Sequence, residues 1–404
     1  MRYIVFAIPA FLALVAVEVL LVRWLGRSDY YSLPDSIADL GTGLLSQLFE
    51  TGLKFAIFAG YVWVYQAHRV QDVPLGSPAA WVLCFLGVDF LYYWFHRTSH
   101  ERNAFWAAHV VHHQSEEFNL AVALRQGTLQ AGLSWTFYLP LAFLGFPPAM
   151  FLACATANTL YQFWIHTRLI GKLGPLEWVF NTPSNHRVHH ARNPRYIDRN
   201  HGGTLIVWDR LFGTYAEETE EPVYGITTPL RSWNPVWANL AYWAELLARV
   251  RRARSTRDRL RFLVARPGWL PEEMGGFQAA PEVDPRTAEK FRRQPPPAVA
   301  AYVVAHFVLA LLAGSAVLFL WDALPVTARL VGTAAIVATL FTGGGMLDQR
   351  PWAAWAEAAR VGLLVPAAAA FGPAAAGMAA LGAVVSALWL MRVRTGLAAR
   401  PSPA

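Results

Sequence analysis

The sequence predicts an all-α fold: a polytopic bundle of transmembrane helices with a histidine-rich site for two metal ions on its cytoplasmic side. Three observations predict it. Hydrophobic residues make up 55% of the 404 residues and charged residues only 15%, which is less charge than a soluble domain carries. Apolar runs long enough to cross a bilayer recur along the chain. Nine of the twelve histidines lie in short clusters between residues 95 and 191.

The apolar runs form a front and a back group. The front group comprises residues 3–24, 55–67 with their flanks and 79–95, then a pair at 129–144 and 147–165. Gly145 and Pro147 interrupt that pair, which predicts a hairpin. Residues 171–297 are polar and rich in arginine, and apolar runs resume at 298–320, 330–346, 361–371 and 373–391. We therefore expect about eight or nine membrane segments.

These changes in composition predict five parts. They are an N-terminal membrane segment and connector (1–52), a histidine-bearing domain (53–235), a basic and Pro-rich cytoplasmic linker (236–297), a C-terminal helical bundle (298–391) and a cytoplasmic tail (392–404). The many alanines and glycines of the C-terminal bundle would let its helices pack closely.

Arginine placement predicts the orientation in the membrane. Arg249 and Arg251 lie in the linker, and Arg392, Arg394 and Arg400 lie in the tail. Because translocated loops avoid basic residues, both segments, and the histidines that border the linker, should face the cytoplasm. Attraction to anionic lipid headgroups explains the basic run, so we expect no nucleic-acid partner. The excess of arginine over lysine and of alanine is typical of GC-rich bacterial genomes, which predicts a multi-pass protein of the bacterial inner membrane.

Histidine spacing is the strongest pattern in the chain. The clusters read HRTSH, HVVHH and HRVHH, with one further histidine between the second and third, at His96, His100, His109, His112, His113, His166, His186, His189 and His190. Residues three or four apart share one face of a helix, so each cluster can direct several imidazoles at one point. A single zinc ion rarely takes more than four ligands. The number of histidines therefore favours two transition-metal ions, and imidazole suits iron, zinc, copper and nickel alike.

Other residue types narrow the choice of site. Cys84 and Cys154 lie within apolar runs and are interpreted as packing residues. Asp89 lies two helical turns before His96, where it would either orient a ligating imidazole or form a helix-packing hydrogen bond.

A protease-type zinc helix is excluded because the histidine required after H-E-x-x is Ala104. Metal transport is disfavoured because the apolar runs hold few acidic residues besides Glu18 and Asp89.

The order of these motifs carries a family resemblance over residues 53–235. The runs are DFLYYWFHRTSHERNAFWAAHVVHHQSEEFNLAVALRQ, LYQFWIHT, NTPSNHRVHHARN and LIVWDRLFGTY. They resemble the fatty acid hydroxylase and sterol desaturase superfamily of membrane di-iron oxygenases and, within it, the alkylglycerol monooxygenase family.

The resemblance implies roles for particular residues. Eight of the clustered histidines match its ligand pattern, His166 matches a ninth ligand, and Gln162 matches a weaker position in or beside the ligand shell. Glu101, together with Asp89, is a candidate for the catalytic site. Further residues of the matching stretch would line the site or a pterin pocket: Asn119, Arg125 and Gln126. His201 is interpreted as a substitution where relatives carry an aromatic residue, and His68 and His306 as structural.

The function implied by the resemblance is oxidation of a membrane lipid. Two iron ions and O2 would hydroxylate a lipid C–H bond, most specifically at the ether-linked carbon of an alkylglycerol. Electrons would come from tetrahydrobiopterin, another reduced pterin or an electron-donor protein. The alternative is a hydroxylase or desaturase of a fatty acyl, sterol, carotenoid or aminolipid substrate. A distant alternative is a membrane metal-binding or transport protein without redox chemistry.

Overall fold

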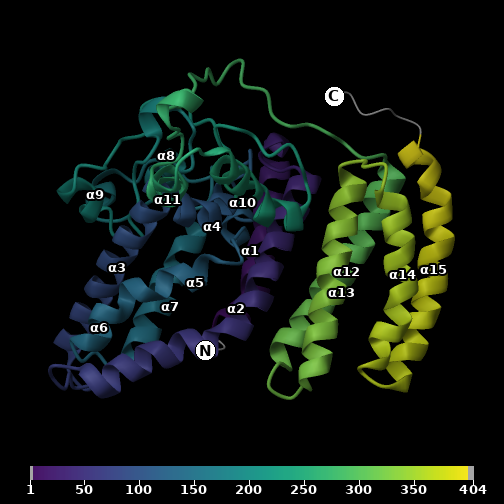
Figure 1. The fold of residues 1–404 in the computed structure, drawn as a ribbon, viewed down its shortest axis with the longest axis horizontal. Coiled ribbons are helices and arrows are strands. Elements are labelled where there is room, and N and C mark those ends of the chain that lie inside the picture. Colours follow the sequence, from purple (N-terminus) through teal and green to yellow (C-terminus); the bar gives the residue numbers. More distant parts are fainter. Residues whose placement is uncertain (1–2, 399–404) are drawn as a thin grey trace.

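Helices make up most of the structure, a computed structural model that describes residues 3–398. Within these residues no β-strand forms, and two isolated bridges pair Phe180 with Leu205 and Ala191 with Tyr224. The predicted all-α fold is confirmed. Figure 1 shows two groups of long helices side by side, with shorter helices and loops covering one end of the first group.

The first group precedes the covering layer along the chain. It consists of α1 (Tyr3–Trp24), α2 (Leu33–His68), α3 (Pro78–Glu101), α4 (Asn103–His113), α5 (Gln130–Ser134), α6 (Leu139–Phe143) and α7 (Pro148–Trp164), with 3-10 turns η1 (Ser28–Tyr30), η2 (Val122–Leu124) and η3 (Trp135–Tyr138).

The covering layer, which we call the polar cap, spans residues 171–296. It contains α8 (Pro183–His189), α9 (Val207–Leu211), α10 (Pro235–Arg252), α11 (Thr256–Val264), η4 (Gly174–Trp178), η5 (Pro194–Tyr196) and η6 (Glu272–Met274). The C-terminal bundle follows as α12 (Pro297–Phe319), α13 (Val326–Leu347), α14 (Ala353–Ala369) and α15 (Pro373–Ala398).

Five helices of the described chain are long and apolar enough to cross a membrane, namely α1, α3, α12, α13 and α15. This confirms a multi-pass membrane protein but gives fewer spans than the eight or nine expected. Two expected spans, α7 and α14, have only 17 residues each, short of the ~20 that cross a bilayer directly. Residues 55–67 form the second half of α2, which Figure 1 shows running across the base of the first group instead of through it.

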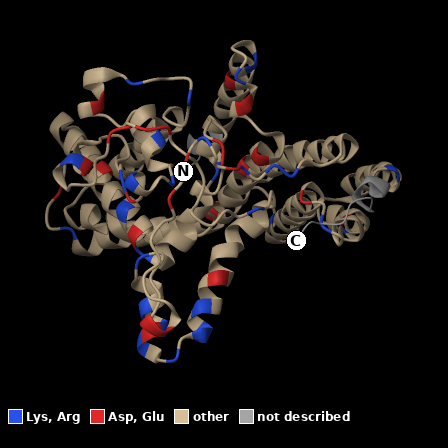
Figure 2. Ribbon diagram, turned by 90° about the horizontal axis from the view of Figure 1, so that it is seen from above, with Lys and Arg blue, Asp and Glu red and all other residues tan. Residues whose placement is uncertain are grey.

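Charge is distributed as a membrane protein requires. Seen from above in Figure 2, Lys, Arg, Asp and Glu gather on loops and helix ends, and the helices of the C-terminal bundle are largely free of them. The hairpin break predicted at Gly145 is present, because α6 ends at Phe143 and α7 begins at Pro148. Residues 129–144 are divided among α5, η3 and α6 and do not form one helix.

The C-terminal bundle joins the first group through α2. Ile37, Leu44 and Leu48 of α2 share one buried apolar cluster with Tyr302 and Val303 of α12 and with residues of α13 and α15. Small residues make this packing close, as expected. A Cβ placed on Gly314 of α12 would lie only 2.5 Å from Leu44 Cδ1.

The predicted division into five parts stays a prediction. Its boundary after residue 297 coincides with the start of α12. The boundary after residue 52 falls inside α2, and the one after residue 391 falls inside α15. Residues 399–404 of the predicted tail, with Arg400, lie outside the described residues.

The turn before α7 generates a stability prediction. Gly145 has φ +90°, and a Cβ there would lie 1.9 Å from the carbonyl oxygen of Gln71. Gly145→Ala should lower the melting temperature of the detergent-solubilised protein, because a left-handed L-residue costs about 1–2 kcal/mol before the clash is counted. The matched control is Gly132→Ala in α5, where a Cβ meets nothing within 4 Å. Equal melting temperatures for the two variants would contradict the prediction.

Candidate metal centre

Four elements carry the nine predicted histidines to one place, where the first group of helices meets α8 of the polar cap. The end of α3 presents two, α4 presents three, α8 with the residue that caps it presents three, and the residue after the C-cap of α7 presents one. All nine side chains are buried. The chain turns sharply at Arg102, between α3 and α4, which lets the first two clusters face each other.

The histidines divide into two groups. Within each group, one ring nitrogen of every residue lies within 4.8 Å of one ring nitrogen of all the others. The five-histidine group is His96, His100, His109, His113 and His189, and the four-histidine group is His112, His166, His186 and His190. The structure thus brings together all nine histidines singled out in the sequence, as two adjacent sites.

Helical geometry explains how each cluster is shared between the groups. On a helix, the side chain at i+4 is rotated by about 40° from that at i, and the side chain at i+3 is rotated by about 60° in the opposite sense. His109 and His113 therefore enter one group, while His112 enters the other. In the α8 cluster the residues four apart are His186 and His190, and His189 crosses to the five-histidine group.

Carbonyl oxygens fix the tautomer of several of these rings. A carbonyl oxygen only accepts, so an Nδ1 atom within hydrogen-bond distance of one carries the proton. The contacts are His96 Nδ1 to His201 O at 2.8 Å, His109 Nδ1 to Gln130 Oε1 at 2.7 Å, His112 Nδ1 to Arg125 O at 2.7 Å, His166 Nδ1 to Gln162 O at 2.7 Å and His189 Nδ1 to Arg199 O at 3.0 Å. Each of these imidazoles then offers an Nε2 lone pair.

Those lone pairs face one another. The Nε2 atoms of His96 and His109 are 3.0 Å apart, and those of His112 and His166 are 3.2 Å apart. All four rings carry their proton on Nδ1, so neither pair can form a hydrogen bond between its Nε2 atoms. Two nitrogens that each lie about 2.1 Å from one metal ion are separated by about 3.0–3.4 Å. The spacing fits a cation held in each group.

Burial keeps the rings neutral. It lowers the pKa of His109 and of His166 to about 4 and that of His189 to about 3. A buried imidazolium would lose its hydration without a compensating anion, so the uncharged form is favoured. Neutral imidazole is also the form that binds a metal ion.

His201 is a residue whose position the sequence interpretation missed. The sequence predicts only a substitution for an aromatic residue here, whereas the structure places the fully buried ring 5.1 Å from the ring of His100 and 5.7 Å from that of His189, centre to centre. Its backbone carbonyl also anchors His96. The carboxylate of Asp209 holds this segment by accepting hydrogen bonds from the backbone N–H groups of His201 and Gly202.

Asp89 does not contact an imidazole, which corrects the predicted role of orienting His96. Its carboxylate accepts hydrogen bonds from the backbone N–H groups of Thr204 and Leu205 and from Trp208 Nε1 and Asn158 Nδ2. The group that accepts the hydrogen bond from His96 Nδ1 is instead the carbonyl oxygen of His201. Asp89 instead ties α3 to the loop that follows His201.

Glu101 pairs with two arginines beside the centre. Its carboxylate lies 3.2 Å from Arg97 Nε and 3.1 Å from Arg266 of the polar cap. It therefore fastens the cap to the end of α3, and its assignment to the catalytic site stays a prediction.

Arg125 supports the centre from within the fold. Its carbonyl oxygen anchors His112, and its guanidinium bonds to Asp39 Oδ1 at 3.0 Å, to Gln114 Oε1 at 3.0 Å and to the carbonyl oxygen of Val111 at 2.6 Å. The buried Asp39–Arg125 pair links α2 to the segment that follows α4. Arg125 thus acts on a predicted ligand through its backbone.

The remaining predicted residues lie at different distances from the rings. Asn119 bonds to the backbone of Tyr30 and Ala121. Gln126 Nε2 lies 3.5 Å from His112 Nδ1, and Gln162 Nε2 donates to Asn158. Assignment of Asn119, Arg125 and Gln126 to a cofactor, and of Gln162 to a metal, stays a prediction.

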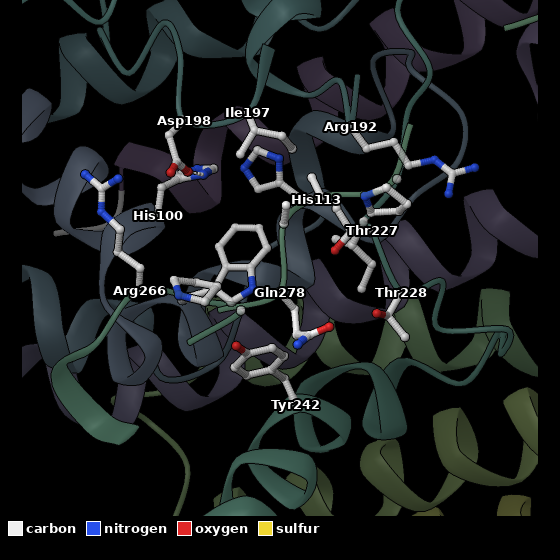
Figure 3. A pocket seen from close by; sticks show the side chains of 18 of the residues that line it. His100, His113, Arg192, Ile197, Asp198, Thr227, Thr228, Tyr242, Arg266 and Gln278 are labelled. Atoms are coloured by element: carbon white, nitrogen blue, oxygen red, sulfur yellow. Dashed lines mark ion pairs between the residues drawn. The ribbon is translucent and has the colours of Figure 1, made fainter. Parts of the chain in front are cut away.

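Two cavities reach different histidines of the centre. The first, about 370 Å³, is lined by residues of the polar cap and by His100, His113, His189 and His190. Figure 3 shows Asp198, Arg266, Tyr242 and Gln278 around it. The second, about 330 Å³, lies among α1, α2, α7 and α12 and reaches His109, His112 and His166. The two cavities have no lining residue in common.

Comparison with known proteins places this centre in a family. The Fatty acid hydroxylase family matches residues 81–214, which include all nine histidines. Alkylglycerol monooxygenase of Xenopus tropicalis is 38% identical over 348 residues, covering 84% of this chain and 76% of that protein. The alkylglycerol monooxygenase of Homo sapiens is 38% identical over 366 residues, covering 89% of this chain and 80% of that protein.

A more distant relative carries a different name. Ornithine lipid hydroxylase of Rhizobium tropici is 29% identical over 186 residues, covering 44% of this chain and 52% of that protein. No solved structure matches the chain. Identity to the two alkylglycerol monooxygenases extends over most of both sequences, far beyond the histidine motifs. The chain therefore belongs to the fatty acid hydroxylase family, in which its homologues include alkylglycerol monooxygenases.

Proposed function

We propose that this protein, an oxygen-dependent lipid hydroxylase, holds two iron ions in its two histidine groups. The proposal rests mainly on the Nε2 lone pairs that face each other within each group. The Nε2 atoms of His96 and His109 are 3.0 Å apart, and those of His112 and His166 are 3.2 Å apart. Imidazole is a ligand that iron accepts. Monooxygenase homologues also make a purely metal-carrying protein the weaker interpretation.

Bound iron and O2 supply what no side chain can, the removal of hydrogen from an unactivated C–H bond and the insertion of oxygen. One oxygen atom enters the C–H bond and the other leaves as water, which requires two electrons and two protons from a donor. The protein's own residues hold the ring tautomers through Gln130, Arg125 and His201. They also bring the lipid carbon to the rings and keep water out.

The cavity among α1, α2, α7 and α12 is the proposed lipid site. Its walls are mainly apolar, with Phe11 and Phe163 stacked 4.2 Å apart, and three histidines line it. By analogy with the alkylglycerol monooxygenases, the oxidised carbon is the one bonded to the ether oxygen. Its hydroxylation yields a hemiacetal, which collapses to an aldehyde and glycerol. The ornithine lipid hydroxylase relative favours oxidation of an aminolipid as the second candidate.

The cavity under the polar cap is the proposed route for electrons. Trp106 lines it and stands 5.0 Å from the ring of His100, centre to centre. A reduced pterin or a donor protein would approach on this side. The arginines of α10 and α11 support a cytoplasmic position for the cap, in a bacterial inner membrane.

The choice of lipid is tested by offering iron-loaded protein a 1-O-alkylglycerol, a monoacylglycerol and an ornithine lipid of equal chain length, with reduced pterin. We expect reductant-dependent O2 uptake and release of a fatty aldehyde from the alkylglycerol alone. Mass spectrometry of the products makes the distinction. Oxidation confined to the acyl chains would exclude the ether carbon, and oxidation of the ornithine lipid alone would favour the second candidate.

Removing one imidazole from either group should deplete iron. His112→Ala and His189→Ala each leave a group one ligand short, and loss even of an outer-shell partner typically lowers metal affinity about 10- to 100-fold. Iron per chain, measured by mass spectrometry after desalting, should fall together with turnover. His68→Ala, which alters an exposed histidine far from both groups, is the control. Full iron content in either variant would remove that residue from the ligand set.

Burial of the histidines predicts a pH dependence of stability. In the metal-free protein His109 and His166 have a pKa near 4, whereas unfolding restores a pKa of about 6.5. The unfolded chain therefore binds more protons between these values, so the free energy of unfolding should decrease as pH falls from 6.5 to 4 and vary little above 7. Thermal unfolding with chelator present measures it. Equal melting temperatures at pH 5 and pH 7 would contradict the assignment.

A further inference from the structure

The lipid cavity is deep, and α2 gives its direction. At one end of α2, Asp39 bonds to Arg125 and Gly43 meets the carbonyl oxygen of Leu124, so this end lies beside the histidine centre. The α2 residues that line the cavity run from Leu40 to Glu50. With a rise of ~1.5 Å per residue, the cavity extends about 15 Å along the helix, away from the histidines.

The C-terminal bundle forms part of this cavity. Helix α12 lies parallel to α2, because Ile37 and Tyr302 line one small pocket, Leu44 adjoins Gly314, and Gly52 adjoins Trp321 just beyond α12. Three α12 side chains, Leu311, Ser315 and Leu318, line the cavity. They lie near the end of α12 that is furthest from the polar cap. A part of the chain outside the matched residues 81–214 thus contributes to the proposed lipid site.

The far end of the cavity is polar, although apolar side chains such as Leu40, Leu44 and Leu311 line the stretch beside it. Gln47 and Glu50 of α2 and Ser315 of α12 line this end. The Glu50 carboxylate accepts hydrogen bonds from Ser46 Oγ at 2.9 Å and from Gln47 Nε2 at 3.5 Å. Gln47 Oε1 is buried and has no hydrogen-bond partner among the described residues. We call these three residues the polar floor.

A hydrocarbon chain cannot extend past the polar floor without cost. Methylene groups placed against the partly exposed Glu50 carboxylate would remove it from water without supplying hydrogen bonds, and burying a polar group in this way costs about 1–3 kcal/mol in proteins. Leu318, which lies one helical turn after Ser315 and also lines the cavity, is only 4% exposed and packs in the α2–α12 cluster, so it forms a wall beside the floor. The favourable length of a chain therefore ends at this floor.

We propose that the polar floor limits the length of the hydrocarbon chain that the enzyme accepts, and that α12 makes the C-terminal bundle part of the substrate site. The proposal rests on the proposed function, since the occupant is the alkyl chain of the lipid being hydroxylated. The chain lies along α2 with its reacting end at His109 and His112 and its terminal methyl group at the floor.

The test is a chain-length profile of turnover, measured with saturated 1-O-alkylglycerols from ten to twenty carbons. Ser315→Trp raises the floor, so the preferred length should shift to shorter chains. One methylene in an apolar pocket is worth about tenfold or more in turnover, so activity on the longest substrates should fall at least about tenfold relative to the shortest. Leu312→Trp, on the exposed side of the same helix, is the matched control and should keep the wild-type profile. Iron content should be unchanged in both.

A second variant and a binding measurement distinguish a failure of the chain-length proposal from a failure of the proposed function. Gln47→Leu removes the unpartnered carbonyl at similar size, so chains longer than the wild-type preference should gain turnover. An alkylglycerol with a photoreactive diazirine at the end of its chain should crosslink to α12, whether or not the protein turns it over. Unchanged profiles in Ser315→Trp and Gln47→Leu, with wild-type turnover intact, would overturn the chain-length proposal alone. No turnover of any lipid by iron-loaded wild type, with crosslinking retained, would instead overturn the proposed function.

Discussion

Carbonyl oxygens hold the protons of the buried imidazoles on Nδ1, and the candidate metal centre depends on this constraint. It turns the Nε2 lone pairs inward, where they face one another at about hydrogen-bond distance with no proton between them. Such an arrangement is unfavourable in a protein interior unless a cation compensates it. The oxygens come from Gln130, the backbone of Arg125 and the loop around His201, so the fold around the centre sets its chemistry.

The polar cap and the membrane helices reach this centre through different cavities. The cap reaches the rings through a cavity lined by several charged residues, among them Asp198 and Arg266, whereas the cavity among the membrane helices is lined mainly by uncharged residues. Because the cavities have no lining residue in common, the proposed lipid site and the proposed electron route do not overlap. Glu101, paired with Arg97 and Arg266, helps to hold the cap over the end of α3.

Helical spacing made much of the centre predictable. The nine histidines could be selected from their i, i+3 and i+4 positions alone, because only one face of a short helix can point at a common centre. Two assignments show where this reasoning fails. Asp89 has the right spacing to reach His96, but the loop after His201 intervenes and takes its hydrogen bonds. His201 has no cluster spacing, so only the loop's path reveals that its ring adjoins that of His100.

The sequence by itself determined the all-α class, the membrane setting and which nine histidines could form a metal centre, because composition and helical periodicity are local properties. The tertiary structure decided how the histidines divide between two groups and which oxygens orient them. It also decided that residues 55–67 run across the base of the first group, and that α12 lines the lipid cavity. These features depend on contacts between segments far apart in the chain, such as Leu44 with Gly314 and His96 with His201, which no local pattern encodes.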